Sequence, residues 1–162
     1  MEDSKGTTYI RMLLDVLVKK EMHLGNLLEL TMHQETLLKQ STFDEITFFQ
    51  LVEKKDEILN KISEIDQGFQ TIYNRVAEVL KENKDQYKEQ IIQMQSLITK
   101  VTDSGMKLTA LEQKNKILLQ QRLQEKKQGI RQFKVGKKTA NTYYKNMIKM
   151  QTGASYFFDK EK

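Results

Sequence analysis

The feature that most constrains the fold is an apolar repeat in the middle of the chain. Its steps alternate between four and three residues, at Ile58, Ile62, Ile65, Phe69, Ile72, Val76 and Val79. This is the heptad pattern, which places one apolar stripe along an α-helix and buries it against a neighbouring helix. The 162 residues include no proline, the residue that breaks helix interiors. The sequence therefore predicts long helices that pack along narrow stripes, with the central one continuing through Gly68.

A second helix is predicted before this repeat. Leucines recur there at three- and four-residue steps, which is the pattern of an amphipathic helix. Either Thr7 or Thr8 can cap its start. We expect this helix over about residues 7–39, with residues 1–6 frayed.

The boundaries of the central helix and of a third helix follow from capping and polar signals. Thr42 and Glu45 have the spacing of a capping box, with Ser41 as a competing cap, so the central helix is expected over about residues 43–80. A stretch without apolar residues follows it. The next apolar stripe predicts a third helix over about residues 84–133, which Gly136 helps to end.

Together these patterns predict an all-α fold. Apolar residues make up 38% of the chain and charged residues 30%, which suits helices with narrow apolar stripes and wide solvated faces. Short turns place neighbouring helices antiparallel. We expect an elongated antiparallel helical hairpin or three-helix, coiled-coil-like bundle over residues 1–133. Residues 134–162 are expected to form a C-terminal extension, a basic and aromatic tail that is loosely ordered or a short helix.

The sequence offers no set of residues for catalysis, cofactor binding or metal binding. It has no cysteine, which removes disulfides, thiolate metal ligands and a cysteine nucleophile. Its two histidines, His23 and His33, lie ten residues apart and lack the spacing of a helical zinc pair. The glycines are scattered and form no phosphate-binding loop. We therefore expect no enzyme activity, no cofactor and no metal site.

The cellular location is expected to be the cytoplasm. No apolar run approaches the ~20 residues that span a membrane. The first residues are acidic before the apolar part of the first helix, which is the reverse of a signal peptide. We therefore expect no membrane insertion.

A basic stretch separates residues 114–149 from the rest of the chain. It contains eleven Lys or Arg and one acid, Glu125, so its net charge is about +10, whereas the whole chain carries +5. Such a stretch can bind nucleic acid through phosphate contacts and aromatic stacking. It can also attract an acidic protein partner or lie in solvent. Because no nucleic-acid-binding motif is present, solvent or a protein partner is favoured, and nucleic acid is the alternative.

The end of the third helix carries more apolar residues than the first two helices are expected to cover. An exposed apolar face there would mark a partner site, and a homodimer through the same face is the competing interpretation. Asn115 lies in the stripe, where a buried Asn usually fixes helix register; alternatively it bonds a partner's backbone. The residues of the expected face are Leu118, Leu119, Leu123, Ile130 and Phe133.

Several stretches, taken in order, resemble the FlgN family of flagellar export chaperones. They are the leucine-rich first helix, LVEKKDEILNKISEID, ALEQKNKILLQQ, and the terminal GKKTANTYYKNM and FFDKEK. Their order and spacing, together with the Tyr-Tyr pair, carry the resemblance, which covers nearly the whole chain.

The resemblance implies a small, cytoplasmic, all-α, non-enzymatic chaperone. Such proteins hold hook–filament junction proteins unassembled and deliver them to the flagellar type III export apparatus. They bind the C-terminal helical segment of the substrate through their own C-terminal part. The related FliT-type chaperones serve the filament cap, so the substrate stays open. By position, the resemblance points to Leu111, Asn115, Leu118, Leu119, Leu123, Tyr143 and Tyr144.

The aromatic tail suggests a movable part. Glycines and many lysines argue against firm packing of this tail in the free protein, whereas exposed aromatics favour burial. We expect the tail to dock loosely over the end of the third helix and to become ordered against the substrate helix on binding.

Overall fold

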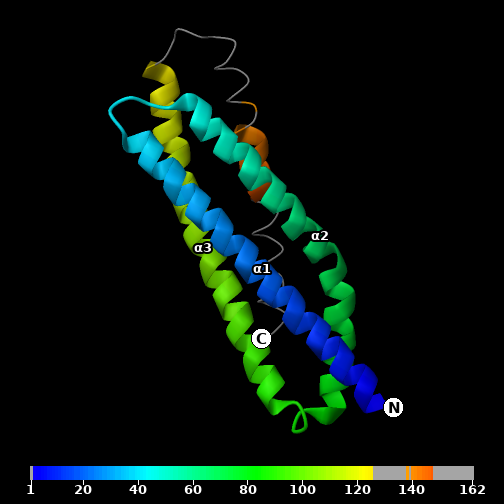
Figure 1. Cartoon of the computed structure of the whole chain (residues 1–162). Helices are drawn as coiled ribbons and strands as arrows, with labels where there is room; N and C mark the ends of the chain where they lie inside the picture. The colour runs from blue at the N-terminus through cyan, green and yellow to red at the C-terminus, as the bar shows by residue number, and fades with distance from the viewer. Residues whose placement is uncertain (1, 126–137, 139, 148–162) are drawn as a thin grey trace.

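The structure, a computed structural model, is all-α. It describes residues 2–125, 138 and 140–147. Three long helices, α1 (Glu2–Lys39), α2 (Glu45–Asn83) and α3 (Lys88–Glu125), are followed by a short helical segment at 140–147 (Figure 1). No strand occurs within these ranges. The predicted fold class, an elongated helical bundle with a C-terminal extension, is confirmed.

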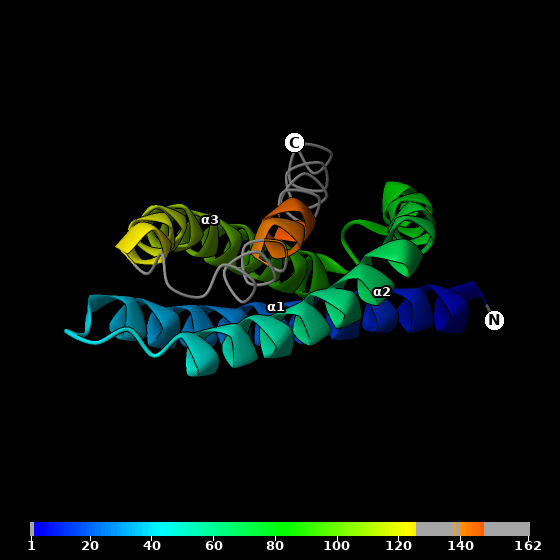
Figure 2. The same cartoon turned by 90° about the horizontal axis from the view of Figure 1, so that it is seen from above.

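The first helix is the centre of the bundle. It runs the length of the molecule and packs against both α2 and α3, whose backbones do not approach each other (Figures 1 and 2). The pairing of α1 with α2 is antiparallel: Lys20 meets Asp66 at 2.7 Å, and Gln34, further along α1, meets Lys55 at 2.5 Å.

The pairing of α1 with α3 is parallel. Glu21 accepts a hydrogen bond from Ser104 at 3.2 Å, and the Leu38 carbonyl accepts one from Arg122 Nε at 2.9 Å. Partners in the two helices are therefore separated by 81 to 84 residues in the sequence. Because α2 returns the chain to the other end of the bundle, α1 and α3 run in the same direction, and these pairs keep one register from Glu21 to Leu38 of α1.

The start of α1 differs from the prediction. Residues 2–6 are helical rather than frayed, and the helix begins at Glu2 instead of near Thr7. The physical reason is tertiary packing at this end of the bundle. Gly6 is buried against Val79, and Thr7 Oγ1 lies 3.3 Å from Tyr87 Oη. These contacts hold a helical turn that local sequence signals alone would leave loose.

The caps of α2 and α3 also differ from the prediction. Asp44, not Thr42 or Ser41, caps α2, because its carboxylate accepts from the Thr47 amide at 3.1 Å and from the Thr47 hydroxyl at 2.6 Å. The helix starts at Glu45 and α3 starts at Lys88, each a few residues later than expected. The predicted continuation of α3 over 126–133 lies outside the described residues.

Two clusters of buried apolar side chains form the core. One, at the end of the bundle that holds the α2–α3 turn, includes Leu13, Phe69 and Met94. The larger one, at the opposite end, draws on all three helices and on residues 140–147. The heptad stripe of α2 contributes buried side chains to the core as predicted, and α2 runs unbroken through the exposed Gly68.

Among the described helices none is apolar and long enough to span a membrane.

Gly68 provides a test of the helix interior. A Cβ atom at Gly68 meets no atom within 4 Å, so Gly68→Ala should raise the free energy of unfolding by about 0.5–1 kcal/mol through helix propensity. The matched control is Gly6→Ala, whose Cβ would lie 2.9 Å from Val79 Cγ1. That variant should gain nothing or lose stability. Urea unfolding followed by circular dichroism measures both, and equal gains would contradict the packing described for Gly6.

Candidate functional site

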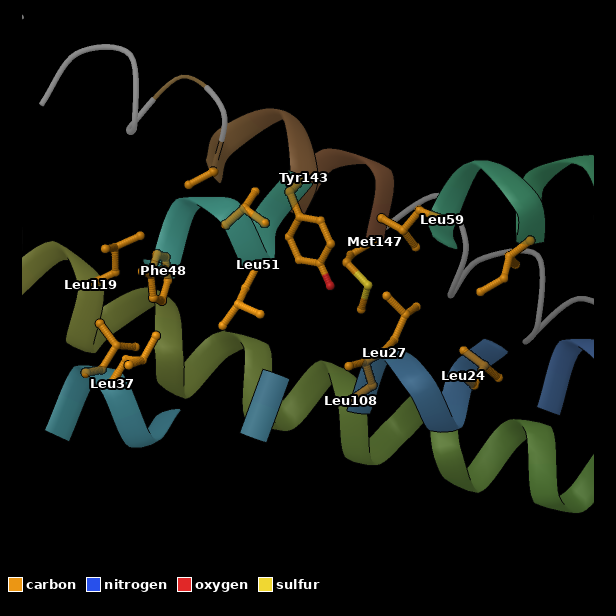
Figure 3. Packing of buried hydrophobic residues seen from close by; sticks show 14 of the residues in the cluster. Leu24, Leu27, Leu37, Phe48, Leu51, Leu59, Leu108, Leu119, Tyr143 and Met147 are labelled. Atoms are coloured by element: carbon orange, nitrogen blue, oxygen red, sulfur yellow. The ribbon is translucent and has the colours of Figure 1, made fainter. Parts of the chain in front are cut away.

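Residues 140–147 fill a groove between α2 and α3, and this groove is the candidate functional site. We call it the tail groove. Because the backbones of α2 and α3 stay apart, the short segment acts as the fourth helix of this half of the bundle (Figure 2). The buried cluster around it includes Leu27 of α1, Leu51 and Leu59 of α2, and Leu108 and Leu119 of α3 (Figure 3).

The segment is held by one apolar face. Ala140, Tyr143 and Met147 follow one another at steps of three and four residues, so they share one side of the helix, and all three are buried. In Figure 3, Tyr143 and Met147 point from the segment into the cluster, with Met147 near Leu59 and Leu27. This is the geometry of an amphipathic helix lying in a groove.

A buried ion pair lies under the segment and bridges the groove. Lys55 of α2 and Glu112 of α3 are both buried and form a salt bridge. Gln34 of α1 also accepts from Lys55 Nζ, at 2.5 Å. The Tyr143 hydroxyl donates to Glu112 Oε1 at 2.5 Å. One carboxylate therefore binds groups from α2 and from the C-terminal segment at once.

Two further buried polar residues extend this cluster toward α1. Thr31 Oγ1 lies 3.1 Å from Glu112 Oε1, and the Asn115 amide donates to the Thr31 carbonyl at 3.0 Å. The Asn115 carbonyl oxygen is buried without a hydrogen-bond partner among the described residues. Asn115 thus occupies the buried position between helices that favours a role in register. We call these residues the buried polar cluster: Thr31, Gln34, Lys55, Glu112, Asn115 and Tyr143.

Burial changes the acid–base properties of the cluster. It lowers the pKa of Lys55 from 10.5 to about 8, while the charge and hydrogen bond of Glu112 oppose that change. Burial, reinforced by the Glu112 charge, raises the pKa of Tyr143 well above 10. Tyr143 therefore keeps its proton at neutral pH and remains a hydrogen-bond donor to the carboxylate.

Weaker contacts hold the edges of the segment. Asn146 donates to Asp56 Oδ1 of α2 at 3.2 Å. On the other side, Lys116 Nζ of α3 lies 5.5 Å from the centre of the Tyr144 ring. In the interior, by contrast, the buried Lys55 Nζ lies 4.2 Å from the Tyr143 ring centre. Polar and cation–π contacts of this kind contribute modestly at exposed sites, so most of the docking depends on the buried face.

The structure gathers most of the sequence-predicted partner residues around this groove or beside it. Leu119, Leu123, Asn115 and Tyr143 are buried, while Leu111, Leu118 and Tyr144 are partly buried. Ile130 and Phe133 lie outside the described residues.

The expectation of an exposed apolar face is wrong for Leu118, Leu119 and Leu123. Leu119 and Leu123 are only 3% and 4% exposed, and Leu118 packs against the same cluster. The reason is the parallel register of α1 and α3, which brings Leu38 alongside Arg122. The end of α1 therefore lies beside α3 as far as Arg122.

Lys55 and Glu112 are the residues that sequence reasoning missed. A signal for both was present in the heptad register. Lys55 stands seven residues before Ile62, and Glu112 stands seven residues before Leu119, so each occupies a buried position of its own stripe. A basic residue and an acidic residue at heptad core positions indicate a buried pair, because an isolated charge there would be costly.

The arrangement defines the class of protein as an all-α bundle with a groove that accepts a short amphipathic helix. No group of metal-binding side chains lies among the described residues. Comparison with known proteins agrees with this class: the model of the FlgN protein family matches residues 9–148. The chain belongs to the FlgN family, the flagellar export chaperones. No curated protein and no solved structure was found to match it.

The ion pair can be tested by a double-mutant cycle. Lys55→Met leaves the Glu112 carboxylate buried without its cation and should lower the free energy of unfolding by about 3–5 kcal/mol. Lys55→Met combined with Glu112→Leu removes both charges and should recover most of that loss. Urea unfolding of the two single variants and the double variant gives the coupling. Additive losses would show that the two side chains do not act as a pair.

The lowered pKa of Lys55 predicts a pH dependence. Between pH 8 and 10 the unfolded chain keeps a proton on Lys55 that the folded chain releases, so the unfolded state binds more protons and stability increases with pH. From pH 7.5 to 9.5 the wild type should gain about 1–2 kcal/mol relative to the Lys55→Met/Glu112→Leu variant. The titrating groups outside the buried polar cluster are common to both proteins and cancel. A constant difference across this range would contradict the shifted pKa of Lys55.

Proposed function

We propose that this protein is a cytoplasmic, non-enzymatic chaperone for hook–filament junction proteins of the flagellum. In this proposal it binds the C-terminal helical segment of its substrate in the tail groove, keeps the substrate unassembled and delivers it to the type III export apparatus. The filament cap protein is the other substrate class to be tested. Family membership supports the role in flagellar export, and the rest is our inference.

The observation that carries the proposal is the occupant of the groove. The chain lays its own amphipathic helix, residues 140–147, between α2 and α3. A groove that accepts Tyr143 and Met147 on one helical face can accept similar side chains of another helix at the same spacing. Only eight residues and a few side chains must leave, so exchange for a longer substrate helix is physically reasonable.

In this mechanism the C-terminal segment changes partner. It covers the apolar lining in the free protein, which limits exposed apolar surface and unwanted association. When the substrate helix enters, the segment leaves the groove and orders against the substrate. The Glu112 carboxylate, freed from Tyr143, then accepts a donor from the substrate, since a buried carboxylate needs hydrogen-bond partners.

The alternative function is nucleic-acid binding through the basic stretch 114–149. Of its described residues, Lys114 is paired with Glu35 of α1, with the two charged atoms 2.9 Å apart, and Lys116 lies over Tyr144. Lys114 is thus engaged within the protein, which favours a protein partner. Salt dependence separates the two functions: binding through phosphate contacts weakens steeply with salt, whereas apolar burial is not screened.

A disulfide that locks the groove tests the proposal. The chain has no cysteine, so Asp56→Cys combined with Asn146→Cys introduces a single pair, at two side chains already in contact. The oxidised protein should bind the C-terminal segment of a junction protein about a hundredfold more weakly than the same protein after reduction. Isothermal titration calorimetry measures both states.

The controls for this experiment are the two single-cysteine variants, which should bind equally under oxidising and reducing conditions. A parallel titration with the C-terminal segment of a filament cap protein identifies the substrate class. Equal binding by the locked and reduced proteins would show that the substrate does not enter the tail groove.

A further inference from the structure

A second groove lies on the outer side of α1 and α3. It contains an open hollow of about 450 Å³ between the two helices. The hollow is lined by Val18 and Glu21 of α1 and by Leu97, Lys100, Asp103, Ser104 and Lys107 of α3. None of these residues belongs to the buried cluster around the tail groove. We call this surface the outer groove.

The α3 edge of the outer groove is a row of lysines. Lys100, Lys107 and Lys114 follow one another at seven-residue steps and are all exposed. The spacing places them on one stripe of the helix, about 10 Å apart. Lys114 pairs with Glu35 across the groove, whereas Lys100 and Lys107 have no ion-pair partner among the described residues. The edge therefore presents two lysines that form no ion pair among the described residues, with Asp103 between them on the same helix.

The α1 edge carries small and apolar side chains beside Glu21, whose carboxylate accepts a hydrogen bond from Ser104. Val18, Gly25 and Met32 also follow at seven-residue steps. Val18 and Met32 are each 54% exposed, and a Cβ atom at Gly25 would meet no atom within 4 Å. Val18 lines the hollow together with Lys100 and Lys107, and the two rows follow the same seven-residue steps on helices that run parallel.

We propose that the outer groove binds an amphipathic α-helix of a partner protein whose apolar stripe is flanked on one side by acidic residues. Heptad steps on both edges match the repeat of such a helix. Its apolar side chains would cover Val18, Gly25 and Met32, while its acids would pair with Lys100 and Lys107. The open hollow gives room for one large apolar side chain at the centre.

The chemistry of the surface favours this occupant over two others. Nucleic acid would leave the exposed apolar side chains Val18 and Met32 uncovered. The chain's own tail is unsuitable by charge, because residues 134–162 contain seven lysines and two acids. Like charges facing each other across an interface are destabilising.

The outer groove and the tail groove can be occupied together. On α3, Glu112 and Lys116 face the C-terminal segment, whereas Lys100, Lys107 and Lys114 follow a different stripe, toward α1. A chaperone with two helix-binding grooves can hold its cargo on one side and contact a second protein on the other.

A designed peptide serves as the probe. It is a fluorescent helix of about 21 residues with leucines at its heptad core positions and glutamates along one flank. Its counterpart carries lysines in place of the glutamates. Fluorescence anisotropy with the full chain should show tighter binding of the glutamate peptide. Lys100→Glu combined with Lys107→Glu should weaken that binding by about tenfold or more and strengthen binding of the lysine peptide.

The matched control is Lys54→Glu combined with Lys61→Glu, two exposed lysines at the same spacing on α2. This variant has the same net charge and should bind both peptides as the wild type does. The proposal is overturned by any of three results: equal loss in the control, equal binding of the two peptides, or binding of a DNA duplex but of neither peptide. Sedimentation of the free chain measures its oligomeric state. If the chain forms a dimer that Lys100→Glu/Lys107→Glu breaks, the occupant of the outer groove is a second copy of the chain, and the proposal is overturned.

Discussion

The ion pair between Lys55 and Glu112 is the interaction on which the C-terminal half of the bundle depends. The backbones of α2 and α3 do not approach each other, yet these two side chains meet in the interior and join the helices. A buried pair contributes little net stability compared with apolar packing, but the loss of one partner is costly. The pair therefore specifies the width of the tail groove and supplies an acceptor for Tyr143, which fixes how residues 140–147 lie.

Much of the fold could be predicted from the sequence, because heptad spacing and the lack of proline are local signals of long helices. The heptad stripe and the continuity through Gly68 were predicted correctly. Helix starts were less predictable, since packing of Gly6 on Val79 orders a turn that lacks a local signal. The burial of the Leu119 side chain could not be predicted for a similar reason. It depends on the parallel register of α1 and α3, and register between helices is a tertiary property.

The candidate site shows the same contrast between local sequence signals, which could be read, and tertiary contacts, which could not. The resemblance to FlgN pointed to Tyr143 and Tyr144 by position, and the structure brings both against α3. Sequence reasoning treated charges as solvent-facing, so it passed over Lys55 and Glu112 although both stand at heptad core positions. Charged residues at heptad core positions of long helices mark the places where two helices meet through polar groups rather than apolar ones.

Docking of residues 140–147 is a near balance, which suits an occupant that must leave. Fixing eight backbone residues costs roughly 8–16 kcal/mol in conformational entropy. Burial of Tyr143, Met147 and most of Tyr144 returns roughly 5–9 kcal/mol, and the hydrogen bond to the charged Glu112 adds about 1.5–3 kcal/mol. Helical hydrogen bonds and cation–π contacts supply the remaining few kcal/mol. Since the favourable terms and the entropy cost are of similar size, a substrate helix needs to bind only slightly better than the segment to replace it, and it can be released as readily.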